Sequence, residues 1–147
     1  MLGHSVSDPL GIEGGAQDVS GLGLLDVETV MAPEKTVRNS HAHSLEFDVA
    51  LSGYEIHLGA TSGPDCSRPS VAMDGRADGA ISPDGRIMGT YLHGLFSSDA
   101  YRARLLASFG IEGGGQNYRQ GVEDALDEVA VELEKVLEPE WLRQWMG

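Results

Sequence analysis

The chain has 147 residues and a formal net charge of −13, from 23 acidic and 10 basic side chains. The length fits one domain with a substantial core, and the negative charge argues against a surface for nucleic acid or anionic membrane. A single cysteine excludes an internal disulfide framework, and no apolar run approaches the roughly 20 residues of a membrane helix. With neither a signal peptide nor a basic transit segment at its start, the chain is expected in the cytoplasm.

The first half of the chain predicts strands. Residues 22–27 are nearly continuously apolar and then alternate up to Val30, which predicts a strand that leaves a buried sheet and is closed by Pro33. Residues 36–42 and 52–58 predict two further strands, with an irregular piece between them.

Turn signals become clearer after residue 70. The turns at residues 73–76 and 82–85 each contain Asp-Gly and separate three short apolar runs. These runs cover residues 70–73, 79–82 and 86–92. They predict a β-meander that ends at His93.

Two helices are expected in the last third. Ser97, Ser98 and Asp99 offer N-cap side chains for a first helix, which Gly110 ends. A second amphipathic helix is predicted over residues 122–137, with its many acids as a solvated face. Its apolar positions are Val122, Leu126, Val129, Leu133 and Val136.

His93 stands at the end of an apolar run, between a predicted strand and a helix start. Imidazole titrates near neutrality, so a histidine in this place suits a general base, although a structural or merely exposed histidine is the common alternative. A base needs a group to activate. The one cysteine, Cys66, has Pro64 and Pro69 on either side and suits a loop better than a nucleophile's tight turn.

Two more groups could carry chemistry. In the strand over residues 52–58, alternation puts Glu55 and His57 on one face, which lines a cleft or faces water. His41 and His43 share a strand face, but a metal site needs three or more convergent ligands, and no metal-binding motif is present. We therefore predict no metal site.

Four segments, in their order and spacing, resemble the class I glutamine amidotransferase domain at the C-terminal end of cobyric acid synthases. The match covers nearly the whole chain and lies in Gly21-Leu22-Gly23-Leu24-Leu25-Asp26-Val27-Glu28-Thr29, Gly53-Tyr54-Glu55-Ile56-His57-Leu58-Gly59-Ala60-Thr61, Asp78-Gly79-Ala80 and Gly89-Thr90-Tyr91-Leu92-His93-Gly94-Leu95-Phe96. Residues 1–147 are then expected to be the C-terminal portion of such a domain.

The resemblance implies an α/β fold, a flavodoxin-like sheet with flanking helices. It also implies that a cysteine attacks the side-chain amide of glutamine, that ammonia leaves for a synthetase domain, and that water releases glutamate. His93 would activate the cysteine and protonate the departing ammonia. Glu55, His57 and Tyr91 are candidates for the border of the same cleft.

Two departures from the family pattern matter. The family's cysteine lies in an elbow ending Gln-Met-Leu-Gly, and this chain opens at Met1-Leu2-Gly3. We therefore expect the nucleophile upstream of Met1, a domain shortened at its N-terminus, and no glutaminase activity from this chain alone. Many relatives also orient the histidine with an acid two residues later, where this chain has Leu95, so Glu55 is only a candidate for that task.

The resemblance names partners outside the chain. Glutamine is the expected substrate of the intact enzyme, a synthetase domain in the same polypeptide would use ATP and Mg²⁺, and no cofactor is expected in this chain. Missing strands would leave a sheet edge or apolar face uncovered, so self-association is a further expectation. Two alternatives stay open: a noncatalytic binding or assembly module, and the glutaminase of a related diamide synthase or cell-wall precursor amidotransferase.

Overall fold

A computed structural model describes residues 1–15, 17–112, 117–137 and 145. Its body is a mixed seven-stranded sheet of order β2-β1-β3-β4-β9, with β5 added to β3 and β6 to β5. Within the described residues, β1 runs parallel to β3 and the other pairs are antiparallel. The strands are β1 (Ser5–Asp8), β2 (Gln17–Ser20), β3 (Glu28–Ser44), β4 (Val49–Ser62), β5 (Val71–Met73), β6 (Arg76–Asp78) and β9 (Leu92–His93), and β7 (Ala80–Ile81) and β8 (Met88–Gly89) pair separately.

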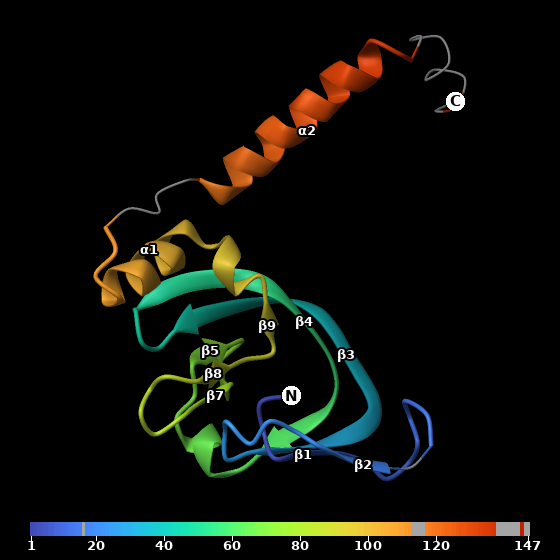
Figure 1. Ribbon diagram of the computed structural model, residues 1–147, viewed down its shortest axis with the longest axis vertical. Coiled ribbons are helices and arrows are strands. Elements are labelled where there is room, and N and C mark those ends of the chain that lie inside the picture. Colours follow the sequence, from blue (N-terminus) through green and yellow to red (C-terminus); the bar gives the residue numbers. More distant parts are fainter. Residues whose placement is uncertain (16, 113–116, 138–144, 146–147) are drawn as a thin grey trace.

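The β3–β4 hairpin is the frame of the molecule. Figure 1 shows its two long strands curving around the N-terminal segment and the short strands β5 to β8. The ladder is interrupted between Val30 and Lys35, a stretch that contains Pro33, which has no N–H to donate. Gly59 faces this interruption with φ of 103°, and a Cβ there would lie 2.3 Å from the carbonyl oxygen of Val30. Glycine thus allows the strands to stay close where the ladder bends.

The predicted strands over residues 36–42 and 52–58 are confirmed, as parts of β3 and β4. The strand predicted from residue 22 to Val30 is confirmed only in part, because β3 begins at Glu28 and continues through Pro33, whereas residues 22–27 lie outside the sheet. Gly23 has φ of 63°, and the N–H groups of Leu24 and Leu25 both bond to the carbonyl of Leu2. This segment is therefore a turn-rich connection, in spite of its apolar side chains.

The two predicted Asp-Gly turns and short strands after residue 70 form, but the continuous meander is wrong, because β5 pairs with β6, β7 pairs with β8 in a separate sheet, and β9 pairs with β4. Asp74 and Gly75 have φ of 48° and 80°, so both central residues of the β5–β6 turn are left-handed, as in a two-residue hairpin loop. Residues 82–87, which include the turn at Asp84-Gly85, separate β7 from β8, and β9 ends at His93. Two 3-10 helices, η1 (Pro64–Ser67) and η2 (Leu95–Ser97), lie in the connections.

Both predicted helices form, with shifted ends. Helix α1 (Asp99–Ser108) is capped by Ser98, whose hydroxyl accepts from the N–H of Tyr101. Helix α2 (Tyr118–Glu134) starts four residues before the predicted position, because the side chain of Asn117 accepts from Gln120 N–H and caps the helix there. It ends three residues before the predicted Leu137. Figure 1 shows α1 against one end of the β3–β4 hairpin and α2 extending away from the body.

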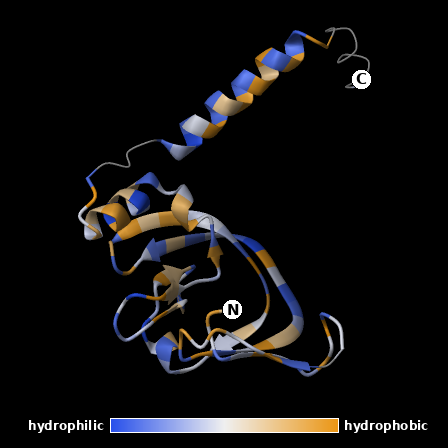
Figure 2. Cartoon of the chain, in the orientation of Figure 1, coloured by the Kyte–Doolittle hydropathy of each residue, from blue (hydrophilic) through white to orange (hydrophobic). Residues whose placement is uncertain are grey.

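Two apolar clusters fill the concave side of the hairpin. The larger joins β3, β4, β5 and β9 to α1 through Tyr101, whose ring meets that of Phe47 edge-on at 5.3 Å. The smaller is built on Leu25, Val27 and Ala80. Figure 2 shows the apolar segments of the hairpin and α1 gathered around this interior. The mixed sheet with helices is the α/β class predicted from the sequence.

Candidate functional site

His93 ends β9, which pairs with β4 so that His93 lies opposite Tyr54. The two rings stack with centroids 4.9 Å apart and planes 3° apart. A Cβ on Gly53 would lie 2.0 Å from the carbonyl oxygen of His93, so only glycine allows the two strands to approach this closely. Gly94 follows with φ of 88° and turns the chain into η2. Local glycines therefore hold His93 at a strand end, as the sequence predicted.

The imidazole of His93 is open to solvent. Among the described residues it has the Tyr54 ring as a neighbour and no hydrogen-bond partner. Val37 and Ile56 pair across the strands on the same side of the sheet. We call Val37, Tyr54, Ile56 and His93 the outer face, whose three other side chains are 42% to 62% exposed. A base on this face can exchange protons with any group that covers it.

Glu55 lies on the opposite side of β4, where it is 1% exposed. Its carboxylate accepts hydrogen bonds from Arg38 Nε at 2.8 Å, Arg76 Nη2 at 2.6 Å and His57 Nε2 at 2.7 Å. Burial by itself would raise the pKa of the Glu55 carboxyl, but the bonds from His57, Arg38 and Arg76 outweigh it and lower the pKa to about 2. Glu55 is therefore an ionised group that joins β3, β4 and β6.

The position of Glu55 tests two expectations from the sequence: that the polar face of β4 lines a cleft or faces water, and that Glu55 orients His93. The alternative in which the polar face of β4 points to water is wrong for Glu55, which points into the protein. Glu55 does not contact His93 either, because neighbouring strand positions face opposite sides and its oxygens are bound elsewhere. The acid that was a candidate for orienting His93 thus lies behind the sheet.

His57 links this cluster to the segment that carries His93. Both of its ring nitrogens face acceptors, since Nδ1 lies 2.9 Å from the carbonyl oxygen of Gly59 and Nε2 meets Glu55. Both hydrogen bonds form together only when the ring carries two protons. The ring stacks on Tyr91 with centroids 4.0 Å apart, and the Tyr91 hydroxyl bonds to Thr61 Oγ1 at 2.5 Å. The structure thus brings Glu55, His57 and Tyr91 together, on the side away from His93.

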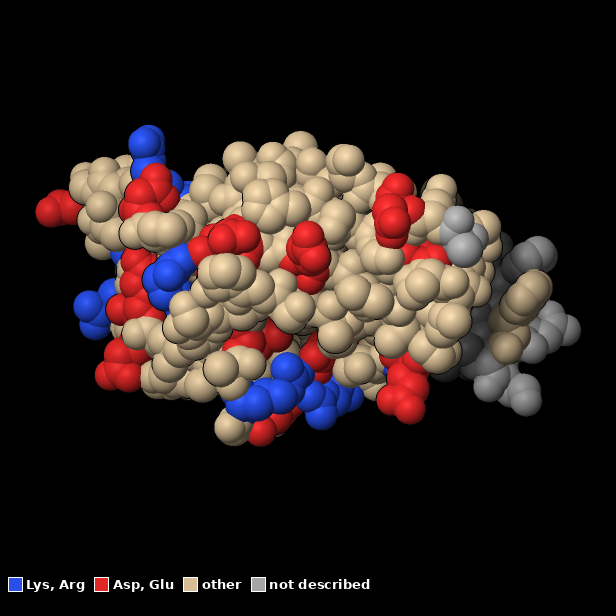
Figure 3. Space-filling view, turned by 90° about the horizontal axis from the view of Figure 1, so that it is seen from below, with Lys and Arg blue, Asp and Glu red and all other residues tan. Residues whose placement is uncertain are grey.

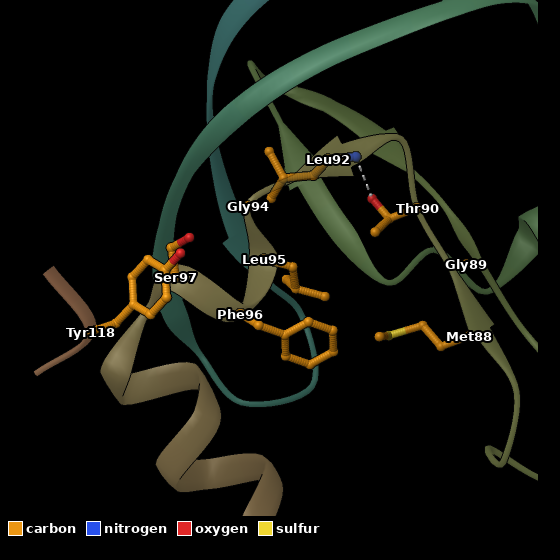
Figure 4. A pocket seen from close by; sticks show the side chains of 9 residues that line it. All are labelled: Met88, Gly89, Thr90, Leu92, Gly94, Leu95, Phe96, Ser97 and Tyr118. Atoms are coloured by element: carbon orange, nitrogen blue, oxygen red, sulfur yellow. Dashed lines mark hydrogen bonds between the residues drawn. The ribbon is translucent and has the colours of Figure 1, made fainter. Parts of the chain in front are cut away.

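Two cavities flank this segment. One of about 480 Å³ is lined by His57, Thr61, Arg76 and Tyr91 among others, together with apolar side chains from the smaller cluster. The other, of about 440 Å³, lies along residues 88–97. Figure 4 shows Met88 and Phe96 at one side of it and Ser97 with Tyr118 at the other, and Leu92 N–H donates to Thr90 Oγ1 at 3.0 Å. His93 lines neither of these two cavities.

Cys66 is unsuited to act as a nucleophile. It lies in η1 and packs against the smaller apolar cluster. Burial, together with the charges of Asp65 and Asp78, raises the pKa of its thiol, which disfavours the reactive thiolate. The sequence-based prediction of a loop cysteine agrees with this position.

The predicted histidine pair offers no ligand set. His43 Nε2 lies 2.6 Å from a carboxylate oxygen of Asp48, across the turn between β3 and β4, and the backbone N–H of His41 donates to Asp74. In the part of the chain that the structure describes, no three His, Cys, Asp or Glu side chains converge as metal ligands.

The charged side chains on one face of the molecule are dispersed. Figure 3 shows acidic and basic side chains scattered over one face, with no continuous basic area on it. No helix among the described residues has both the length and the apolar character to cross a membrane.

Sequence reasoning missed Arg38, Arg76 and Gly53. Alternation in the predicted strand over residues 36–42 places Arg38 on one face, but nothing in the sequence shows that this face meets Glu55. The turn signal at residues 73–76 places Arg76 in a turn. Both contacts depend on strand register, which is set by pairing between distant segments.

The sequence of the chain is similar to one protein family and to several curated proteins. Residues 1–101 match the family of the CobB/CobQ-like glutamine amidotransferase domain. The chain is 69% identical over 147 residues to the cobyric acid synthase of Rhizobium meliloti (strain 1021), covering 100% of this chain and 30% of the relative. It is 72% identical over 142 residues to a cobyric acid synthase of Sinorhizobium sp., covering 97% and 29%. The chain thus spans about 30% of the length of these curated relatives. On this evidence it belongs to the family of CobB/CobQ-like glutamine amidotransferase domains.

Proposed function

We propose that the chain is the glutaminase portion of a cobyric acid synthase. It would release ammonia from glutamine for the ATP-dependent amidation of corrin carboxylates in cobalamin biosynthesis. Membership of the amidotransferase family and the names of the relatives support this function. The same names favour it over a diamide synthase or a cell-wall precursor amidotransferase.

His93 is the catalytic base in this proposal. Its imidazole takes the proton of a cysteine thiol, the thiolate attacks the amide carbon of glutamine, and the carbon–nitrogen bond breaks. The imidazolium gives its proton to the amide nitrogen as that bond breaks, so that ammonia leaves, and water then cleaves the thioester to release glutamate and the free thiol. The single observation that carries this role is the His93 ring itself, solvent-exposed and without a hydrogen-bond partner in the described residues.

The nucleophile in this scheme is not Cys66. Its raised thiol pKa and its place in the smaller apolar cluster speak against attack on a substrate. The cysteine would come from the longer polypeptide and approach the outer face. That polypeptide would also complete a class I, flavodoxin-like sheet and hold ATP and Mg²⁺ in its synthetase portion.

A chimera tests the role of His93. The matched region of the Rhizobium meliloti relative is replaced by this chain, and release of glutamate and ammonia from glutamine is measured. We expect activity in the chimera and a loss of about 100-fold or more with His93→Ala, because general acid–base catalysis contributes about 10² to 10⁴. The matched control is His43→Ala, an imidazole on the same hairpin that pairs with Asp48.

Two results would reject the proposal. One is a His93→Ala chimera that keeps its activity. The other is ammonia release by the chain alone that depends on Cys66, since the chain alone is expected to be inactive. A chimera that folds, binds glutamine and never releases ammonia would favour a noncatalytic module instead.

A further inference from the structure

Helix α2 carries a line of apolar side chains that covers nothing in the described structure. Val122, Leu126, Val129 and Leu133 recur at intervals of four and three residues, which places them on one side of a helix. They are 41% to 58% exposed, and no residue of α2 is buried. Figure 2 shows apolar and polar segments alternating along α2, which extends away from the body. We call these four residues the α2 stripe.

The first residue of α2, Tyr118, contacts helix α1 of the body. Tyr118 N–H donates to Asp99 at 3.0 Å, and the guanidinium of Arg102 lies over the Tyr118 ring at 5.6 Å. The stripe begins one turn later. Helices without tertiary packing are marginal in water, so an amphipathic helix of 17 residues is expected to gain stability by laying its apolar side on another surface.

The charge on α2 restricts what that surface can be. Arg119 is the only basic residue between Tyr118 and Glu134. The same helix carries the six acids Glu123, Asp124, Asp127, Glu128, Glu132 and Glu134. A groove that accepts the stripe therefore has an apolar floor and basic edges. A second copy of this chain is a poor occupant, because each copy has a net charge of −13.

The comparisons point to one occupant. The amidotransferase family match ends at residue 101, before α2 begins, whereas the match to the Rhizobium meliloti relative spans all 147 residues. The sequence of helix α2 thus matches a cobyric acid synthase but lies outside the residues that match the CobB/CobQ-like amidotransferase domain. More than two thirds of that relative lies outside the match.

We propose that the α2 stripe docks this chain onto the rest of a cobyric acid synthase polypeptide, in an apolar groove bordered by Lys and Arg. This inference rests on the proposed function, since it takes the longer enzyme as the setting of the chain. The interaction is of the helix-in-groove type, with four anchors and a charged rim. The docked helix would hold the glutaminase portion, which releases ammonia, at a defined place on the synthetase portion, which uses it.

A binding experiment in two pieces tests the proposal. The probe is the portion of the Rhizobium meliloti relative that this chain does not match, produced as a separate polypeptide, shown to be folded by circular dichroism and cooperative urea unfolding, and titrated with the chain in a calorimeter. The stripe variant is Leu126→Gln with Leu133→Gln, because Gln removes the apolar group and keeps helix propensity. The control is Val131→Gln, an equally exposed valine on α2 outside the stripe.

We expect the wild-type chain and the Val131 variant to bind alike and the stripe variant to bind at least about tenfold more weakly, as for loss of central apolar anchors. Added salt should weaken wild-type binding. Circular dichroism of each free chain checks that α2 still forms.

Three results would overturn the proposal. They are equal binding by the stripe variant, no binding of the probe by the wild-type chain, and stripe-dependent self-association in sedimentation. This binding experiment and the activity test of His93 can fail independently. The His93→Ala chain should bind the probe normally whether or not His93 is the catalytic base.

Discussion

Replacing Glu55 by Gln tests the buried cluster that supports the site. The substitution keeps the shape of the side chain but removes the negative charge that Arg38, Arg76 and His57 share. It also puts an amide N–H₂ donor where three donors already converge. We therefore expect a loss of stability out of proportion to the small change in structure.

The magnitude follows from the burial of the carboxylate. Removal of one member of a buried ion pair costs about 3 to 5 kcal/mol. The side chains of Arg38 and Arg76 are 48% and 42% exposed, so water compensates part of the loss on their side. We expect the lower end of the range, a decrease of about 3 kcal/mol in the free energy of unfolding.

The lowered pKa of Glu55 arises from the same contacts and leads to a similar magnitude. It falls from an ordinary value of 4.5 to about 2 in the folded protein. Because the folded-state pKa is the lower one, the carboxylate stabilises the fold above pH 4.5, and this contribution is lost as the pH falls from 4.5 to about 2. At about 1.4 kcal/mol per unit, the loss is about 3 kcal/mol.

Urea denaturation of wild type and Glu55→Gln, at neutral pH and at about pH 2, is the assay. The two proteins should differ by about 3 kcal/mol at neutral pH. The difference should shrink at about pH 2, where the Glu55 carboxyl is about half protonated in the folded protein and almost fully protonated in the unfolded chain. Glu34→Gln, at an exposed position of the same hairpin, should change stability by less than about 0.5 kcal/mol. A difference below about 1 kcal/mol at neutral pH, or one that does not depend on pH, would refute the reasoning.

Two further substitutions test the position of His93 and the role of the cysteine. Gly53→Ala should cost about 2 kcal/mol or more in urea denaturation and shift the imidazole resonances of His93, because the added Cβ would meet the His93 carbonyl at 2.0 Å. Unchanged stability with unchanged resonances would show that β9 does not approach β4 this closely. Cys66→Ser in the chimera should leave ammonia release within about twofold of wild type, since its thiol pKa is raised and it packs away from His93. A much larger loss, with the fold intact by circular dichroism, would make Cys66 the nucleophile.

Local sequence signals predicted much of the fold. The Asp74-Gly75 and Asp84-Gly85 turns need left-handed residues, and both glycines have positive φ. Ser98 and Gly110 bound the first helix through capping and a left-handed turn. These features act over a few residues, so they can be read without knowledge of the rest of the chain.

Two predictions from residue type were wrong because the backbone conformation and the strand pairing differ from what those residues suggest. The segment at residues 22–27 looks like a buried strand, yet the left-handed Gly23 and bonds to the N-terminal residues keep it out of the sheet. Pro33 looks like a strand end, yet β3 passes it because an interruption in the ladder tolerates the missing N–H.

The sequence by itself determined the family motif around His93, the alternation that separates Glu55 and His57 from Tyr54, and the apolar spacing of α2. Only the tertiary structure decided which way each face points. Strand register brings Arg38 and Arg76 to Glu55 and leaves His93 on the outer face with Tyr54. The physical reason is that alternation defines two faces of a strand, whereas burial and pairing with distant segments choose which of them becomes the interior.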